Sequence, residues 1–115
     1  MGAWAEDAVA RCVCVLALDR FGDYSGRMVA PVRETAAQLL AVAALQLEVG
    51  KMRQAADLLV ELTTAEDWQP RHGGFCGLES LCAASAFLRD LVHRAAPRGL
   101  SDPAEDVCAA AARAV

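Results

Sequence analysis

The sequence predicts an all-α protein in which antiparallel helix pairs stack as a short solenoid. Apolar residues make up 56% of its 115 residues and aromatic residues only 5%. Apolar side chains recur every three or four residues, and no stretch alternates apolar and polar residues as a half-buried strand does. In addition, two helix starts 38 residues apart, around Arg33 and Arg71, carry similar residues. Together these observations predict five helices in about two and a half repeats.

The first helix is expected over about 4–20. Glu6 and Asp7 lie in its first turn, where the helix dipole favours negative charge. Its apolar residues extend almost around the helix, and they are Val9, Cys12, Val13 and Leu16, joined by Cys14, Val15 and Leu18. A helix that is apolar on two sides is typically packed between neighbours, so this pattern favours a layered stack.

The second helix is expected from Pro31 to about Glu48. Proline fixes its own φ and lacks a donor that a first helical turn does not use, so it suits a helix start. Gly22 and Gly26 suit the preceding chain reversal because glycine adopts positive φ without a Cβ penalty. Gly50 is expected to end this helix and to begin a tight turn into an antiparallel third helix.

The third helix is expected to bury residues at helical spacing, namely Met52, Ala55, Leu59 and Leu62. A fourth is expected from Pro70 to His93, although it contains the three glycines Gly73, Gly74 and Gly77. Each glycine costs about 1 kcal/mol in a helix interior relative to alanine, so their spacing predicts that another backbone approaches closely.

The residues 96–99, Ala-Pro-Arg-Gly, are expected to form a linker after the fourth helix. Asp102 with Pro103 and Glu105 then suggests a capping box, which would start a last helix ending at Ala114. The period of about 38 residues, with a helix, a turn and a second helix, is typical of HEAT repeats. We therefore expect a single segment, 1–115, with repeat one at 4–48, repeat two at 50–95 and the first helix of a third repeat at 101–115.

Charge and cysteine content exclude several classes of function. The net charge of −4 argues against direct nucleic-acid binding, which needs clustered Lys and Arg. The five cysteines include no C-x-x-C pair, and we expect buried reduced thiols in an intracellular reducing compartment. His72 and His93 lack finger-like spacing, so no metal is expected. The longest apolar stretch, 36–47, is too short to span a membrane, and no signal peptide is expected.

Three motifs together carry a resemblance to a known family. They are Leu-Asp-Arg-Phe-Gly-Asp-Tyr at 18–24, Val-Ala-Pro-Val-Arg-Glu-Thr at 29–35 and Trp-Gln-Pro-Arg-His-Gly-Gly at 68–74. In residues, order and spacing they resemble the HEAT-repeat region of the TATA-binding-protein-associated Swi2/Snf2 ATPases. The resemblance covers about 13–91 of this chain but only a small part of a family member.

The resemblance implies a protein-binding segment of a nuclear transcription regulator. In this family the HEAT array grips TATA-binding protein, and a C-terminal motor uses ATP to remove it from DNA. The sequence contains no G-x-x-x-x-G-K-[ST] loop, so we expect no motor, no catalytic residue and no cofactor in this chain. The implied partners are TATA-binding protein and flanking HEAT repeats of a longer chain. Because fewer than three full repeats are present, exposed repeat ends predict self-association or marginal stability.

The candidate interface residues lie in or beside the turns between helices. They are Phe21, Asp23, Tyr24, Arg33, Trp68, Arg71 and His72. Arg33 and Arg71 could contact a partner, or could pair with carboxylates from an adjacent turn or repeat, such as Asp19, Asp23 or Asp67. The aromatic residues could be interface anchors or could pack between repeats.

Two other interpretations remain open from the sequence. One is a HEAT scaffold for a different partner. The other is a small all-α enzyme or ligand-binding domain, in which Arg71, His72 and Asp67 would meet at one pocket. A general-base role for His72 would need a nucleophile or second acid, which the motif does not supply.

Overall fold

The computed structural model describes residues 2–18 and 31–115, and these residues are helical with no strand among them. The elements are α1 (Gly2–Leu18), α2 (Pro31–Ala44), α3 (Val49–Leu62), α4 (Trp68–Ala84), the short 3-10 helix η1 (Ala86–Leu88), α5 (Arg89–Leu100) and α6 (Glu105–Ala114). The predicted all-α class is confirmed. The expected helix start at Pro31 is also confirmed, as is a third helix that buries Met52, Ala55 and Leu59.

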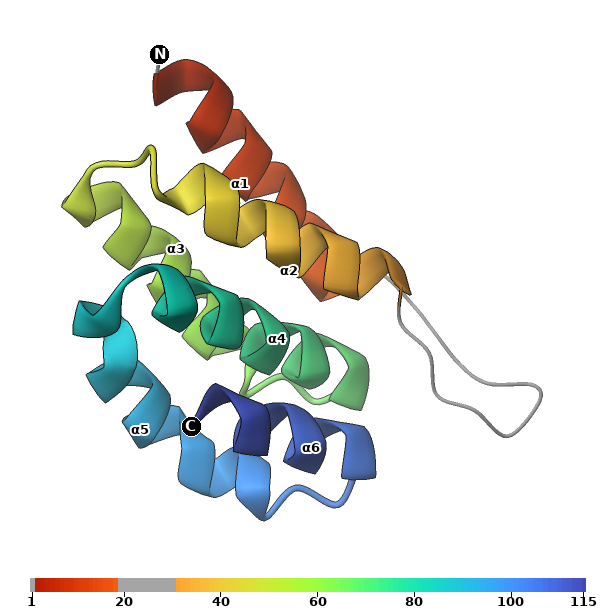
Figure 1. Ribbon diagram of the computed structural model, residues 1–115. Coiled ribbons are helices and arrows are strands. Elements are labelled where there is room, and N and C mark those ends of the chain that lie inside the picture. The colour runs from red at the N-terminus through yellow and green to blue at the C-terminus, as the bar shows by residue number, and fades with distance from the viewer. Residues whose placement is uncertain (1, 19–30) are drawn as a thin grey trace.

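The α-helices stack as three antiparallel pairs, α1–α2, α3–α4 and α5–α6 (Figure 1). The first helices of the pairs run in one direction and the second helices run back, so each pair adds one helix to each of two layers. Helix α4 is central, because it packs against α2 and α6 in its own layer and against α1 and α3 in the other. This arrangement fits a helical repeat.

The glycines of α4 allow it to pass close to two other backbones. A Cβ on Gly73 would overlap the carbonyl oxygen of Leu16 in α1, and one on Gly74 would lie 2.7 Å from the carbonyl oxygen of Leu59 in α3. A Cβ on Gly77 would meet the Leu59 side chain at 2.5 Å. The predicted close approach of another backbone is confirmed at Gly73 and Gly74, whereas Gly77 faces the Leu59 and Leu16 side chains instead of a backbone. This close approach lets α4 pack against both α1 and α3.

The predicted helix from Pro70 to His93 is wrong, because the chain breaks at Ser85. Ser85 has extended backbone angles, φ −151° and ψ 110°, and η1 follows it before α5 begins. The described residues therefore contain six α-helices where five were predicted. The break lets α5 run back along the stack, where it buries the apolar residues Leu91, Val92, Ala95 and Ala96.

The predicted linker at 96–99 is also wrong, since these residues lie inside α5. Gly99 is buried, and a Cβ there would lie 2.5 Å from both the Phe75 ring and the Ala111 side chain. Close packing against α4 and α6 thus explains why a glycine occupies this helical position, although its propensity favours a loop.

Three smaller predictions are corrected as well. Helix α2 ends at Ala44, and Gly50 lies in the first turn of α3 instead of ending the preceding helix. Helix α6 begins at Glu105 without the predicted capping box, because the Asp102 side chain accepts a hydrogen bond from the Ala104 amide at 2.9 Å and forms an Asx-type turn. All five cysteines are free thiols, but Cys14 is exposed, unlike the buried Cys12.

Candidate functional site

The predicted interface residues fall into two groups. Phe21, Asp23 and Tyr24 lie outside the described residues. Arg33 lies near the start of α2, and Trp68, Arg71 and His72 lie in the first two turns of α4. Their role as interface residues stays a prediction, and the structure shows where the second group lies.

Arg33 is completely buried where three helices meet. Its Nη1 atom donates to the carbonyl oxygen of Leu16 at 2.7 Å and to that of Gln69 at 2.8 Å. The Leu16 carbonyl belongs to the last turn of α1, where the helix dipole favours a positive charge. Arg33 of α2 therefore joins the end of α1 to the start of α4. Both carbonyl oxygens that Arg33 contacts, those of Leu16 and Gln69, belong to this chain and not to a partner.

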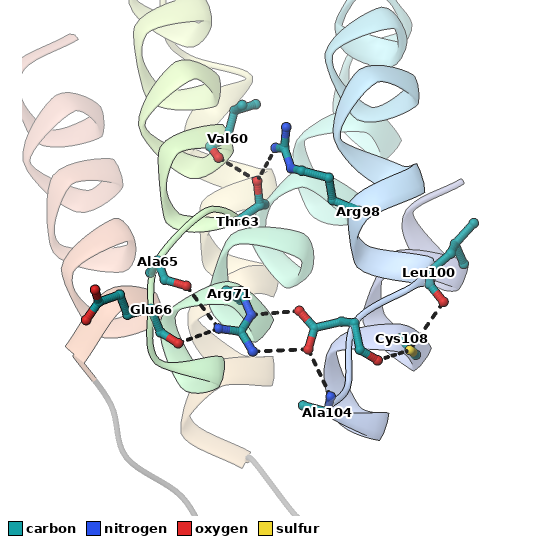
Figure 2. Close-up of polar contacts among 10 residues, drawn as sticks. Val60, Thr63, Ala65, Glu66, Arg71, Arg98, Leu100, Ala104 and Cys108 are labelled. Atoms are coloured by element: carbon teal, nitrogen blue, oxygen red, sulfur yellow. Dashed lines mark hydrogen bonds and ion pairs between the residues drawn. The ribbon is translucent and has the colours of Figure 1, made fainter.

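Arg71 joins the second helix pair to the third (Figure 2). Its Nε donates to Asp102 Oδ2 at 2.7 Å and its Nη2 to Asp102 Oδ1 at 3.1 Å, while Nη1 donates to the carbonyl oxygens of Ala65 and Glu66. Burial by itself raises the pKa of Asp102, but the hydrogen bonds from Arg71 and from the Ala104 amide, with the Arg71 charge, lower it below its ordinary value. The carboxylate partner thus comes from the adjacent helix pair.

Further polar contacts line the same seam between α3–α4 and α5–α6 (Figure 2). Arg98 Nη2 of α5 donates to Thr63 Oγ1 at 3.1 Å across this seam, whereas Cys108 Sγ donates to the Asp102 carbonyl oxygen at 3.0 Å within the third helix pair. These contacts hold the third helix pair in place. Arg71 is therefore enclosed in a structural junction.

A groove of about 580 Å³ opens on the layer formed by α2, α4 and α6. Helix α4 forms its floor, and α2 and α6 form its two walls. The floor consists of His72, Cys76, Glu79, Ser80 and Ala83; the wall on α2 consists of Glu34, Ala37, Gln38 and Ala41; the wall on α6 consists of Asp106, Ala109 and Arg113. Of the predicted residues, His72 is the one that lines this groove.

The floor of the groove contains a histidine and a cysteine in contact, His72 and Cys76. Burial lowers the pKa of His72 to about 4, helped by the positive charges of Arg33 and Arg113. Burial also raises the pKa of Cys76 to about 11, although its Sγ lies 3.5 Å from His72 Nε2. At neutral pH the imidazole is therefore neutral and the thiol protonated, so the pair does not form an activated nucleophile.

Neither groove described in this section brings Arg71, His72 and Asp67 together. His72 lines the groove, Arg71 is held in the seam with Asp102, and Asp67 is the exposed residue that precedes α4. Within residues 2–18 and 31–115 no three His, Cys, Asp or Glu side chains gather as metal ligands. In the same ranges no helix is both long and apolar enough to cross a membrane.

Most residues of the groove are not among those predicted from the sequence. His72, Cys76, Glu79 and Ala83 follow one another at spacings of three and four residues, so helical periodicity alone places them on one face of α4. The walls could not be found in this way, because Glu34 and Asp106 lie on helices far apart in sequence.

A second groove, about 570 Å³ and mainly apolar, lies along the outer face of the α1–α2 pair. Ala8, Cys12 and Val15 of α1 and Ala36 and Leu39 of α2 line it. No described helix covers this face, on which Leu39 is 48% exposed. The first helix pair thus presents an open apolar surface at one end of the stack.

Comparison with known proteins gives matches along almost the whole chain. The chain is 42% identical over 117 residues to "TATA-binding protein-associated factor 172" of Homo sapiens and 37% identical over 115 residues to "TATA-binding protein-associated factor BTAF1" of Arabidopsis thaliana, matches that cover 95% and 96% of this chain. It is 36% identical over 124 residues to "TATA-binding protein-associated factor mot1" of Aspergillus fumigatus. The chain spans only 6–7% of the length of these relatives. No protein-family model matches it.

Proposed function

Because this chain is homologous along about 95% of its length to a short segment of the TATA-binding protein-associated factor family, we propose that it is a protein-binding helical-repeat segment of a transcription regulator. The similarity along the chain to relatives from animals, plants and fungi is the observation that carries this proposal. The stacked helix pairs support it, since such stacks offer extended binding surfaces.

The helix pairs α1–α2, α3–α4 and α5–α6 are proposed to be three successive HEAT-type repeats. Arg33 and Arg71 support this division, because each lies in the first turn or so of the second helix of its pair and donates to the next pair, Arg33 to the Gln69 carbonyl oxygen and Arg71 to the Asp102 carboxylate. In a solenoid, such nearest-neighbour contacts hold one repeat to the next. Arg33 and Arg71 would then occupy equivalent positions in two successive repeats.

The proposed partner is TATA-binding protein, which the names of the relatives identify as their associate. A nuclear location follows from the same proposal. The chain matches a segment that is small for a motor domain, so ATP-driven removal of the partner from DNA would be performed elsewhere in a longer protein. The open apolar face of α1–α2 is proposed to be covered by a flanking repeat there.

Of the three predicted aromatic anchors, Trp68 lies within the described residues. It is partly exposed at the start of α4, and its ring meets the His72 ring edge-on with centroids 6.5 Å apart. Partly exposed tryptophans are frequent energetic anchors of interfaces. Phe21 and Tyr24, which precede α2 in the sequence, are proposed as further anchors.

A pull-down with purified TATA-binding protein tests this function. Binding that survives high salt but is lost when Phe21, Tyr24 and Trp68 are changed to Ala would support it, because contacts made by aromatic anchors are less sensitive to screening than charge pairs. A partner other than TATA-binding protein would be indicated by absence of binding in an otherwise folded chain.

A further inference from the structure

The residues that line the groove over α4 favour one class of binding partner. We propose that it binds a basic segment of a partner protein, laid along α4 between α2 and α6, with its Lys or Arg side chains against Glu34 and Asp106. This inference rests on the proposed protein-binding function and assigns that function a surface.

The shape of the groove fits a short stretch of chain. Its floor runs from His72 to Ala83, twelve residues of α4 whose eleven steps of 1.5 Å extend about 16 Å. Such a length accommodates about five residues of extended chain at about 3.3 Å each. The walls expose small side chains, Ala41 and Ala109, so a backbone can approach between α2 and α6.

The charges of the groove are mainly negative. Glu34, Glu79 and Asp106 line it, against the single cation Arg113 and the neutral His72. Arg113 is already engaged, since its Nε lies 3.5 Å from Glu79 Oε2. Within the described residues Glu34 and Asp106 form no ion pair. One carboxylate on each wall therefore faces the groove without a cation.

This charge distribution decides the class of ligand. A nucleic acid or an acidic peptide would meet two uncompensated carboxylates, and the whole chain, with a net charge of −4, would repel it as well. A basic peptide instead gains an ion pair at each wall, where an acidic ligand would be repelled. A basic protein segment is thus the occupant that both shape and charge favour.

The experiment measures binding of a fluorescent peptide of about ten residues that alternates Arg and Ala, long enough to exceed the groove. A peptide that alternates Glu and Ala is the control ligand. The test variant is Glu34→Lys with Asp106→Lys. The matched control variant is Glu48→Lys with Glu61→Lys, which changes net charge equally at exposed positions outside the groove. Circular dichroism confirms that each variant is folded, and Glu34→Gln with Asp106→Gln replaces the test variant if it is not.

The expected result is a dissociation constant raised at least about tenfold by the groove variant and less than about twofold by the control variant. Equal weakening by both variants, or no binding of the basic peptide to the wild-type chain, overturns the proposal. Binding to TATA-binding protein is measured in parallel. If the basic peptide binds in the groove and TATA-binding protein does not bind, the groove proposal stands and the assigned partner is wrong.

Discussion

Arg71 and Asp102, 31 residues apart in sequence, form a two-point ion pair with N–O distances of 2.7 and 3.1 Å. Both side chains are largely buried, with 16% and 8% of their surface exposed. Asp102 also accepts a hydrogen bond from the Ala104 amide and so stabilises the turn into α6. One carboxylate therefore fixes the last helix pair both to α4 and to its own turn.

Replacing Asp102 by Ala should lower the free energy of unfolding by about 2–4 kcal/mol, because it leaves a buried guanidinium without its carboxylate. Asp102→Asn should cost less, since its amide oxygen can still accept the Ala104 amide. Urea unfolding measures both. The exposed i, i+4 pair Arg94–Asp90 gives the control: Asp90→Ala should change stability by less than about 0.5 kcal/mol. Equal effects at Asp90 and Asp102 would contradict the assigned role.

Gly73→Ala should destabilise the chain severely, by about 3 kcal/mol or more, because the new Cβ would overlap the Leu16 carbonyl and displace the Arg33 guanidinium. Gly50→Ala is the matched control, since no atom lies within 4 Å of a Cβ at that position in α3. It should stabilise the chain by about 0.5–1 kcal/mol through helix propensity. Thermal unfolding of the two variants should therefore shift in opposite directions, and a tolerated Gly73→Ala would refute the close approach of α4 to α1.

Much of the fold follows from local patterns, and the exceptions come from tertiary packing. The helix start at Pro31 and the close approach at Gly73 and Gly74 were predictable, because proline geometry and the cost of glycine act locally. The break at Ser85 was not, since the apolar pattern continues through it. Pro97 and Gly99 indicate a loop by propensity, but both lie inside α5, and Gly99 is required there because Phe75 and Ala111 fill the space that a side chain would occupy.

The candidate site was less predictable than the fold. Periodicity identifies a shared face of α4 that contains His72 and Cys76, but it does not identify which helices stand beside that face. Asp102 was recognised only as a residue near a helix start, because nothing local indicates that Arg71 lies opposite it. Contacts between separate helix pairs depend on how the pairs stack.

The stability of the chain should fall as the pH decreases from about 6.5 toward 4. The folded-state pKa of His72 is about 4, below the ordinary value of 6.5, so in this window the unfolded chain takes up a proton that the folded chain does not. Stability is fully present above pH 6.5 and is lost as the pH falls through this range. The total loss is on the order of 3 kcal/mol.

Urea unfolding at several pH values measures this dependence, and NMR titration of the His72 ring measures the pKa directly. His72→Gln should remove the pH dependence assigned to this group, whatever its effect on stability at pH 7. His93→Gln, at an exposed position of α5, is the matched control variant. An unchanged slope in the His72→Gln variant would show that other groups cause the pH dependence.

The isolated chain should self-associate through the apolar face of α1–α2. Leu39 and Val42 of α2 are 48% and 60% exposed, and Leu39 borders the apolar groove. Changing Leu39 to Glu should shift the chain toward a monomer in sedimentation velocity runs, because a charge at an apolar contact opposes association. Leu58→Glu, at a similarly exposed leucine on α3, is the control. A wild-type monomer with a sharp, concentration-independent melt would contradict this prediction.

The most direct test of the proposed function is the affinity of this chain for TATA-binding protein, measured by isothermal titration calorimetry with purified proteins. We expect a saturable complex that Trp68→Ala weakens by at least about 1 kcal/mol, because Trp68 is proposed as an interface anchor. The absence of binding, even when the flanking segments of a longer protein are restored, would contradict it.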